Sequence, residues 1–199
     1  LYATPGYPVV MTEDTEPGVF TRSVHSGTDP DPATGARAPP IHQTTSYAFE
    51  HAEDAASQFA LEKPGYIYSR LLNPTVESLQ ERLADLEGGV GAVATSSGMA
   101  GLDLTTLLLA EAGDNIVAAS ALYGGTYTYL THTVPRRGIE SRFVETLDYE
   151  AYGEAIDEDT AYVLIETIGN PALITPDIER IAAIAHEHDT PLLVDNTFA

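Results

Sequence analysis

Residues that could bind a ligand follow four of the short apolar runs in this sequence. A turn of small residues lies at 95–98, and Tyr123 precedes two glycines. Asn170 precedes a proline, and Asp195 comes directly after the apolar run at 192–194. Open α/β sheets bind ligands outside the carboxyl ends of their strands. If these runs are parallel strands of one sheet, the four positions lie at a common edge.

Together, the four positions describe a site for a flat, phosphorylated, nitrogen-bearing cofactor. Backbone N–H groups of the turn could bind a phosphate, and the ring of Tyr123 could stack on a planar group. The Asp195 carboxylate could pair with a protonated ring nitrogen. Asn170 could reach a ring oxygen, because a residue before proline is biased to extended backbone. Pyridoxal phosphate fits this description. Each position also has an ordinary interpretation, as a closely packed turn, a packed tyrosine or a simple Asn-Pro turn.

Other kinds of active site find little support in the sequence. The turn at 95–98 matches neither G-x-x-x-x-G-K-[ST] nor G-x-G-x-x-G, which argues against a nucleoside triphosphate or a dinucleotide. Ser96 and Ser97 lack the flanking glycines of a serine hydrolase elbow. His186 and His188 resemble metal ligands, but residues two apart on a helix face different directions. We interpret them as residues of a helix end.

The region after residue 91 alternates short apolar runs with helical patterns. The five predicted strands are 92–94, 116–119, 141–144, 161–165 and 192–194. The predicted helices between them are 99–110, 124–133, 149–156 and 177–187. Such alternation predicts the doubly wound α/β class, a mostly parallel sheet covered by helices on both faces.

The region before the sheet is interpreted as an extended arm. Residues 11–72 are rich in Asp, Pro, Gly and Thr and contain one short predicted helix at 52–61. Such a segment buries too little apolar surface to become ordered by itself. Asn73 and the proline after it predict the capped start of a long helix. The apolar residues of that helix, spaced three and four apart, lie on one face.

The composition is strongly acidic. Thirty Asp and Glu residues against nine Lys and Arg give a formal net charge of −21. Nucleic acids and anionic membranes need a basic footprint, so neither is expected as a partner. The acidic residues are spread along the chain, as in proteins whose surfaces suit high salt, and a halophilic source is a hypothesis. The sequence has no cysteine and no apolar run long enough to span a membrane, and we predict a cytoplasmic protein.

Seven motifs of the chain, in this order, resemble the pyridoxal-phosphate-dependent enzymes of cysteine and methionine metabolism. The closest resemblance is to the O-acetylhomoserine sulfhydrylase branch. The motifs are DPATGAR (31–37), QTTSY (43–47), YSR (68–70) with NPT (73–75), SSGM (96–99), ALYGGTY (121–127), ETIGNP (166–171) and VDNTF (194–198). The resemblance implies the large domain of the fold type I, aspartate-aminotransferase-like transferases, with an extended N-terminal arm.

The resemblance also implies a role for individual residues. The backbone at Ser97, Gly98 and Met99 would hold the cofactor phosphate. Tyr123 would stack on the pyridine ring and could take part in proton transfer. Asp195 would keep the ring nitrogen protonated.

Four further residues receive roles from the resemblance. Asn170 would lie near the phenolic oxygen of the cofactor, and Thr197 would belong to the cofactor surroundings. Tyr68 and Arg70 would reach the phosphate in a partner subunit. The active unit would then be a dimer, within a homotetramer built from two such dimers.

The implied reaction is γ-replacement, in which sulfide displaces acetate from O-acetyl-L-homoserine to give L-homocysteine. A cystathionine γ-synthase or γ-lyase of the same family is the alternative enzyme, and a non-catalytic or oligomerisation module is the alternative of another class. The Schiff-base lysine of the family follows the Asp-bearing strand and is absent here, because the sole lysine is Lys63. We therefore expect three parts: a disordered leader at 1–10 before the candidate start Met11, an arm at 11–72, and a partial cofactor-binding domain at 73–199.

Overall fold

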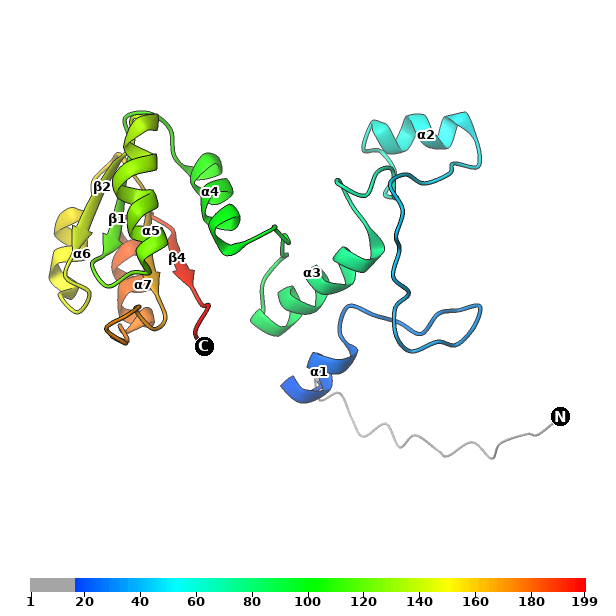
Figure 1. The fold of residues 1–199 in the computed structure, drawn as a ribbon, viewed down its shortest axis with the longest axis horizontal. Coiled ribbons are helices and arrows are strands. Elements are labelled where there is room, and N and C mark those ends of the chain that lie inside the picture. Colours follow the sequence, from blue (N-terminus) through cyan, green and yellow to red (C-terminus); the bar gives the residue numbers. More distant parts are fainter. Residues whose placement is uncertain (1–16) are drawn as a thin grey trace. The chain divides into compact units, whose positions relative to one another are not determined.

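The computed structural model describes residues 17–199, and it divides into two compact units (Figure 1). The first unit ends at Ala94, and the second runs from Thr95 to Ala199. The predicted leader at 1–10 and the candidate start at Met11 lie outside the described residues. The first unit includes the helix that starts after Asn73, which the sequence-based boundary assigned to the sheet domain.

The second unit is built on a four-stranded parallel sheet in the order β2-β1-β3-β4. Its strands are β1 (Asn115–Ala119), β2 (Glu140–Val144), β3 (Thr160–Glu166) and β4 (Leu192–Asp195). β2 lies on one side of β1, and β3, the next strand in the chain, lies on the other side of β1. The strand order therefore reverses between β1 and β3, which is the switch point where open sheets bind their ligands.

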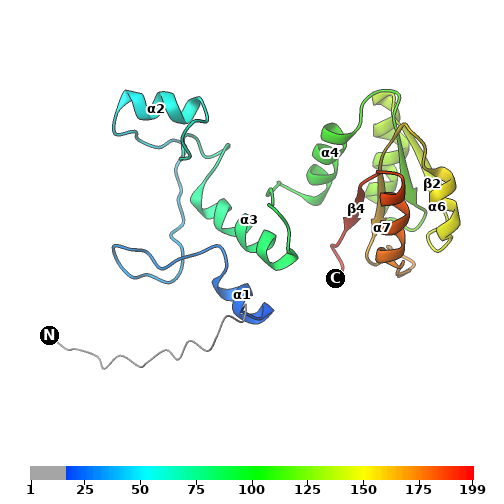
Figure 2. The same cartoon turned by 180° about the vertical axis from the view of Figure 1, so that it is seen from behind.

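Helices cover both faces of this sheet. Figures 1 and 2, seen from opposite sides, show α5 on one face and α7 on the other. The helices of the second unit are α4 (Gly98–Leu109), α5 (Gly124–Thr128), α6 (Tyr149–Ala155) and α7 (Ile178–Glu187). α5 continues through a π-helical turn, η1 (Tyr129–Thr133), and a 3-10 turn, η2 (Val134–Arg137). The predicted α/β class with a parallel, helix-covered sheet is confirmed.

The core of the second unit lies on the two central strands. All five residues of β1 and the last five of β3 are buried. Strands covered on both faces are apolar almost throughout, which is why these runs were recognisable in the sequence. The buried Tyr162 hydroxyl lies 2.8 Å from the Thr106 hydroxyl and links β3 to α4. Burial raises the pKa of Tyr162 to about 12.

The predicted strand at 92–94 is wrong. These residues form no strand, and Val93 is 83% exposed. The backbone N–H of Ala94 donates to the side-chain oxygen of Gln80 at 2.9 Å instead of to a neighbouring strand. A three-residue apolar run next to glycines has little to pair with, so its composition alone was a poor guide.

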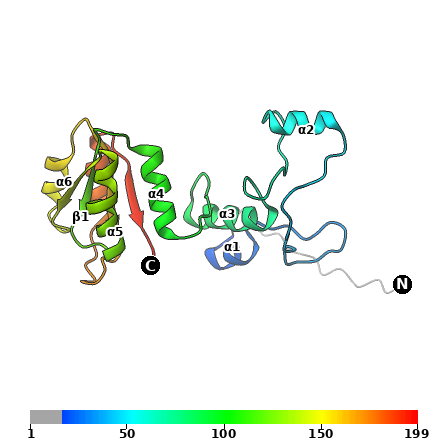
Figure 3. The same cartoon turned by 45° about the horizontal axis from the view of Figure 1, so that its top comes forward.

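Between residues 17 and 94, the first unit consists of three helices joined by extended segments. They are α1 (Val19–His25), α2 (Ala52–Phe59) and α3 (Pro74–Glu87). α3 is capped as predicted, because the Asn73 side chain accepts from the N–H of Thr75, and Gly88 ends the helix with a φ of 65°. α1, which the sequence did not predict, packs beside α3 (Figure 3). The Arg22 guanidinium donates to the backbone carbonyl of Asp85 at 2.8 Å and holds the two helices together.

The described part of the first unit, residues 17–94, has no core of its own. Among residues 17–94, Asn73 is the only buried residue. The predicted apolar face of α3 forms, but Val76, Leu79 and Leu83 on it are 40%, 51% and 46% exposed. Burial within residues 17–94 therefore offsets little of the entropy cost of ordering them. Within the described residues, no helix is long and apolar enough to cross a bilayer.

An ion pair at the opposite end of the sheet predicts an acid-sensitive contribution to stability. Asp157 accepts from Arg142 at 2.6 Å and from the Asn115 amide at 2.7 Å, and these bonds lower its pKa from 3.8 to about 2. The folded state therefore holds its proton less tightly than the unfolded state, and the contribution is complete above about pH 4. It should disappear as the pH falls through about 2.

The measurement is the thermal midpoint of wild type and Asp157→Asn between about pH 5 and 2. The difference between the two proteins should shrink as the pH falls, because only the wild type loses the charged bond. A difference that stays constant over this range would contradict the assignment.

Candidate active site

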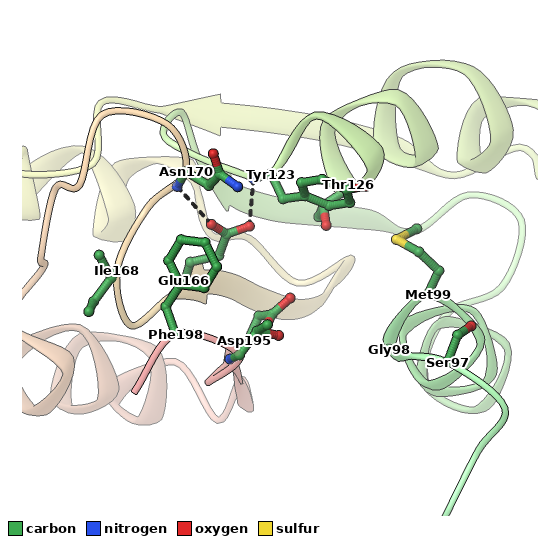
Figure 4. A pocket seen from close by; sticks show the side chains of 11 residues that line it. Ser97, Gly98, Met99, Tyr123, Thr126, Glu166, Ile168, Asn170, Asp195 and Phe198 are labelled. Atoms are coloured by element: carbon green, nitrogen blue, oxygen red, sulfur yellow. Dashed lines mark hydrogen bonds between the residues drawn. The ribbon is translucent and has the colours of Figure 1, made fainter.

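A pocket of about 320 Å³ opens at the switch point of the second unit (Figure 4). Its lining comes from the start of α4 and from the segments that follow β1, β3 and β4: Ser97, Gly98, Met99, Tyr123, Thr126, Glu166, Ile168, Asn170, Asp195, Thr197 and Phe198. Seven of the nine predicted cofactor residues are among them. The volume is in the range of small-molecule and cofactor sites.

The start of α4 provides an anion-binding wall. The Ser97 hydroxyl accepts from the N–H of Ala100 at 3.1 Å and caps the helix. The N–H groups of Gly98 and Met99 belong to the first turn, so no carbonyl within the helix can accept from them. Free N–H groups and the positive end of the helix dipole suit a phosphate. The prediction that this turn follows a strand was wrong, yet its position at a helix start is confirmed.

Tyr123 lies between the end of β1 and the start of α5. Its side chain is half-exposed, and its backbone N–H donates to a carboxylate oxygen of Glu166 at 2.6 Å. A ring in this setting can stack on a flat ligand, since the backbone beneath it is held while its outer surface is free.

Two carboxylates lie side by side on the sheet. Glu166 and Asp195 are register partners on β3 and β4, so their side chains project from the same face, and both line the pocket. Asp195 Oδ1 accepts from the Thr197 backbone N–H at 3.0 Å and from its hydroxyl at 2.5 Å. A pocket with two negative charges favours a cationic group on its ligand. Thr197, assigned to the cofactor surroundings, also orients Asp195.

Four lining residues were absent from the predicted site: Thr126, Glu166, Ile168 and Phe198. Glu166 is 6% exposed, and its second oxygen accepts from the Asn170 N–H at 3.1 Å. The sequence held a signal for it, because Glu166 is the first charged residue after the apolar run of β3. The other three are ordinary residues in loops or helices and carry no comparable signal.

Tyr68 and Arg70 are not part of this pocket. Both belong to the first unit, where the Arg70 guanidinium lies 5.5 Å from the centre of the Tyr68 ring. The sole lysine, Lys63, donates to Asp54 at 2.7 Å, and this bond raises the pKa of Lys63. A lysine that forms covalent bonds needs a lowered pKa, so Lys63 is unsuited to that role. No cluster of three or more His, Asp or Glu residues that could hold a metal occurs in the part of the chain described.

Comparison with known proteins finds homocysteine synthases and O-acetyl-L-homoserine sulfhydrylases among the relatives of this chain. The homocysteine synthase of Schizosaccharomyces pombe is 49% identical over 178 residues, which cover 89% of this chain and 42% of that protein. O-acetyl-L-homoserine sulfhydrylase 1 of Thermus thermophilus is 49% identical over 179 residues, which cover 89% of this chain and 42% of that protein. The chain thus spans less than half the length of these curated relatives.

A solved structure shows the same fold. The crystal structure of a proposed O-acetylhomoserine (thiol)-lyase from Campylobacter jejuni, which contains N'-pyridoxyl-lysine-5'-monophosphate, aligns with a TM-score of 0.87 and 37% identity. The alignment covers 92% of this chain and 45% of that one. A family model, described as Cys/Met metabolism PLP-dependent enzyme, where PLP is pyridoxal phosphate, matches residues 20–199. The chain therefore belongs to the family of pyridoxal-phosphate-dependent enzymes of cysteine and methionine metabolism.

Proposed function

We propose that this chain forms the cofactor-binding part of an enzyme that converts O-acetyl-L-homoserine and sulfide to L-homocysteine and acetate. The observation that supports it most is the convergence, in one pocket, of a capped helix start, a half-exposed tyrosine and a carboxylate at a strand end. These are a phosphate donor set, a stacking surface and a partner for a cationic ring, which together fit pyridoxal phosphate. The names of the relatives at 47–50% identity support the reaction.

Each residue has a distinct task in the proposed site. The N–H groups of Ser97, Gly98 and Met99 bind the phosphate at the start of α4. The Tyr123 ring covers one face of the cofactor, and the Asp195 carboxylate keeps the ring nitrogen protonated. Bound pyridoxal phosphate supplies the electron sink for negative charge that develops on the substrate.

Two more residues complete the set proposed around the cofactor ring. The Asn170 amide donates near the phenolic oxygen, and Thr197 holds Asp195 in place. We also propose that the Tyr123 hydroxyl can transfer a proton at the exposed face of the cofactor.

The proposal needs groups that this pocket lacks. The lining contains neither lysine nor arginine among the described residues, so we propose that the lysine that carries the cofactor and the cation that binds the substrate carboxylate come from outside this lining. We propose that Tyr68 and Arg70 bind the phosphate in a partner subunit, in a tetramer of two active dimers. The parts at 1–10, 11–72 and 73–199 and a cytoplasmic location remain predictions from the sequence.

The test uses the full-length protein. It should purify with a visible absorption band of lysine-bound pyridoxal phosphate, and it should release acetate and homocysteine from O-acetyl-L-homoserine and sulfide. Cystathionine formed with cysteine as the preferred acceptor would identify a cystathionine γ-synthase, and cleavage of cystathionine would identify a γ-lyase. A full-length protein that binds no pyridoxal phosphate would contradict the proposal and favour a non-catalytic module.

A salt titration tests the hypothesis of a halophilic protein. With a net charge of −21, self-repulsion opposes folding, and the screening length falls from about 10 Å at 0.1 M salt to about 3 Å at 1 M. The thermal midpoint should rise as KCl increases over this range. A protein that becomes more stable as salt is diluted would contradict the hypothesis.

Gly125 offers a direct test of the Tyr123 ring. A Cβ added at Gly125 would run into Cε1 of the Tyr123 ring, whereas one at Gly124 would meet nothing within 4 Å. Because the ring is half-exposed, it can swing away without unfolding the protein. Gly125→Ala should therefore keep its thermal midpoint but bind pyridoxal phosphate about fivefold more weakly, as loss of a stacking contact of about 1 kcal/mol implies.

The matched control is Gly124→Ala, which should bind the cofactor as the wild type does. Equal cofactor affinity in both variants and in the wild type would count against a stacking role for Tyr123.

A further inference from the structure

Glu166 joins two segments of the pocket that are far apart in the sequence. It ends β3, and its side chain is almost fully buried. Oε1 accepts from the backbone N–H of Tyr123, which follows β1, and Oε2 accepts from the backbone N–H of Asn170, which follows β3. Figure 4 shows both bonds leaving the one carboxylate. Both oxygens therefore have main-chain partners in the segments on either side of the switch point.

The partners of this carboxylate are unusual for a buried acid. A buried charge normally pairs with a cation, and burial without strong partners is unfavourable. The pocket lining holds no Lys or Arg within the described residues, so the compensation comes from charge-assisted bonds to main-chain N–H groups. This arrangement links the two main-chain segments through one side chain.

A second contact joins the same two segments. A Cβ added at Gly169 would lie 2.7 Å from the carbonyl oxygen of Ala121 and 2.9 Å from its Cβ. The main chains before Tyr123 and before Asn170 thus approach as closely as glycine allows. The carboxylate bridge and this close approach are thus two separate contacts that hold the segments together.

We propose that Glu166 is a positioning residue that sets the separation and orientation of Tyr123 and Asn170 across the pocket. The inference rests on the proposed function, in which the Tyr123 ring stacks on pyridoxal phosphate and the Asn170 amide donates to it. Glu166 acts through these two residues and through their main chain. This role requires two acceptor oxygens on one side chain. Aspartate and glutamate have two, whereas asparagine and glutamine have one.

Glu166→Gln is the discriminating variant. Glutamine has nearly the same size, but it offers one acceptor oxygen and one NH₂ donor, so one of the two N–H groups would face a donor. In the protein without cofactor, hydrogen exchange at the backbone N–H of Tyr123 or of Asn170 should accelerate about 10- to 100-fold, as the loss of a charge-assisted bond predicts. The amides of β1 and β3 should keep their protection.

The second readout is cofactor affinity in the full-length protein. Pyridoxal phosphate should bind to Glu166→Gln about tenfold or more weakly than to the wild type. The loss of stability, measured through the thermal midpoint, should be smaller in free energy than this loss of binding. The matched control is Glu154→Gln, which removes the charge of an exposed glutamate on α6 and should change neither measurement.

Several results would overturn the inference. Unchanged exchange at both amides, or accelerated exchange with unchanged cofactor affinity, would overturn it alone. A wild-type protein that takes up no cofactor would overturn both it and the proposed function. If Glu166→Gln does not fold, Glu166→Asp replaces it, because that side chain keeps two acceptors but is one carbon too short to reach both segments. Wild-type protection of both amides in Glu166→Asp would then overturn the inference.

Discussion

Replacing Asp195 by asparagine in the full-length protein is expected to lower kcat about 10- to 1000-fold while the fold stays intact. An opposite charge within about 4–6 Å shifts a pKa by about 1–3 units, and each unit is about 1.4 kcal/mol, or tenfold in rate. The variant loses the charge that would keep the ring nitrogen protonated. It retains a side-chain oxygen that can accept from the Thr197 backbone N–H, as Asp195 Oδ1 does at 3.0 Å in the wild type.

The measurement is kcat with O-acetyl-L-homoserine and sulfide, together with the thermal midpoint. Asp189→Asn is the matched control, because Asp189 is exposed at the end of α7 and its φ of 55° is one that asparagine tolerates. The control should have wild-type turnover. Near-normal turnover of Asp195→Asn would refute the proposed role of the carboxylate.

Strand ends were the most predictable part of the site. β1 and β3 are buried almost throughout, and β2 and β4 pair with them. The apolar runs of these strands stand out in the sequence for that reason. Once the strands are parallel, the residues after them must share an edge, so Tyr123, Asn170 and Asp195 meet in the pocket as expected.

The partners of Glu166 could not be read from the sequence. Its bond to the N–H of Tyr123 depends on β1 and β3 being neighbours, and the order of strands in a sheet leaves no local mark in composition or periodicity. The same limit applies to α1, whose Arg22 bonds to a carbonyl more than sixty residues away in the chain. Local patterns predict helices and strands, but they do not predict the long-range contacts that determine how these elements are arranged.

The exposed face of α3 shows the converse limit. Spacing of three and four correctly predicted a helix with Leu79 and Leu83 on one side, and the caps at Asn73 and Gly88 are as expected. An apolar face normally indicates burial. Here both leucines remain about half exposed, because the described residues of the first unit provide no second layer to cover them. Periodicity reports that a face is suited to burial, and the rest of the fold determines whether it is buried.

Gly169→Ala is expected to have the largest effect on stability among the substitutions considered. The new Cβ would meet the carbonyl oxygen of Ala121 at 2.7 Å and its Cβ at 2.9 Å, and neither atom can rotate away. One of the two segments must shift, and overpacking of this kind costs about 1–3 kcal/mol. The shift would also move Tyr123, two residues after Ala121, so cofactor affinity should fall with stability.

Urea unfolding of the full-length protein measures the first effect, as a lower midpoint at an unchanged slope. Gly153→Ala is the control, because its Cβ would make only an ordinary contact, 3.6 Å from Ile184 on α7, and alanine favours the helix in which it lies. The control should be as stable as the wild type or slightly more so. Equal stability of Gly169→Ala and Gly153→Ala would mean that the segments after β1 and β3 are free to move apart, and the bridging role of Glu166 would then lose its second support.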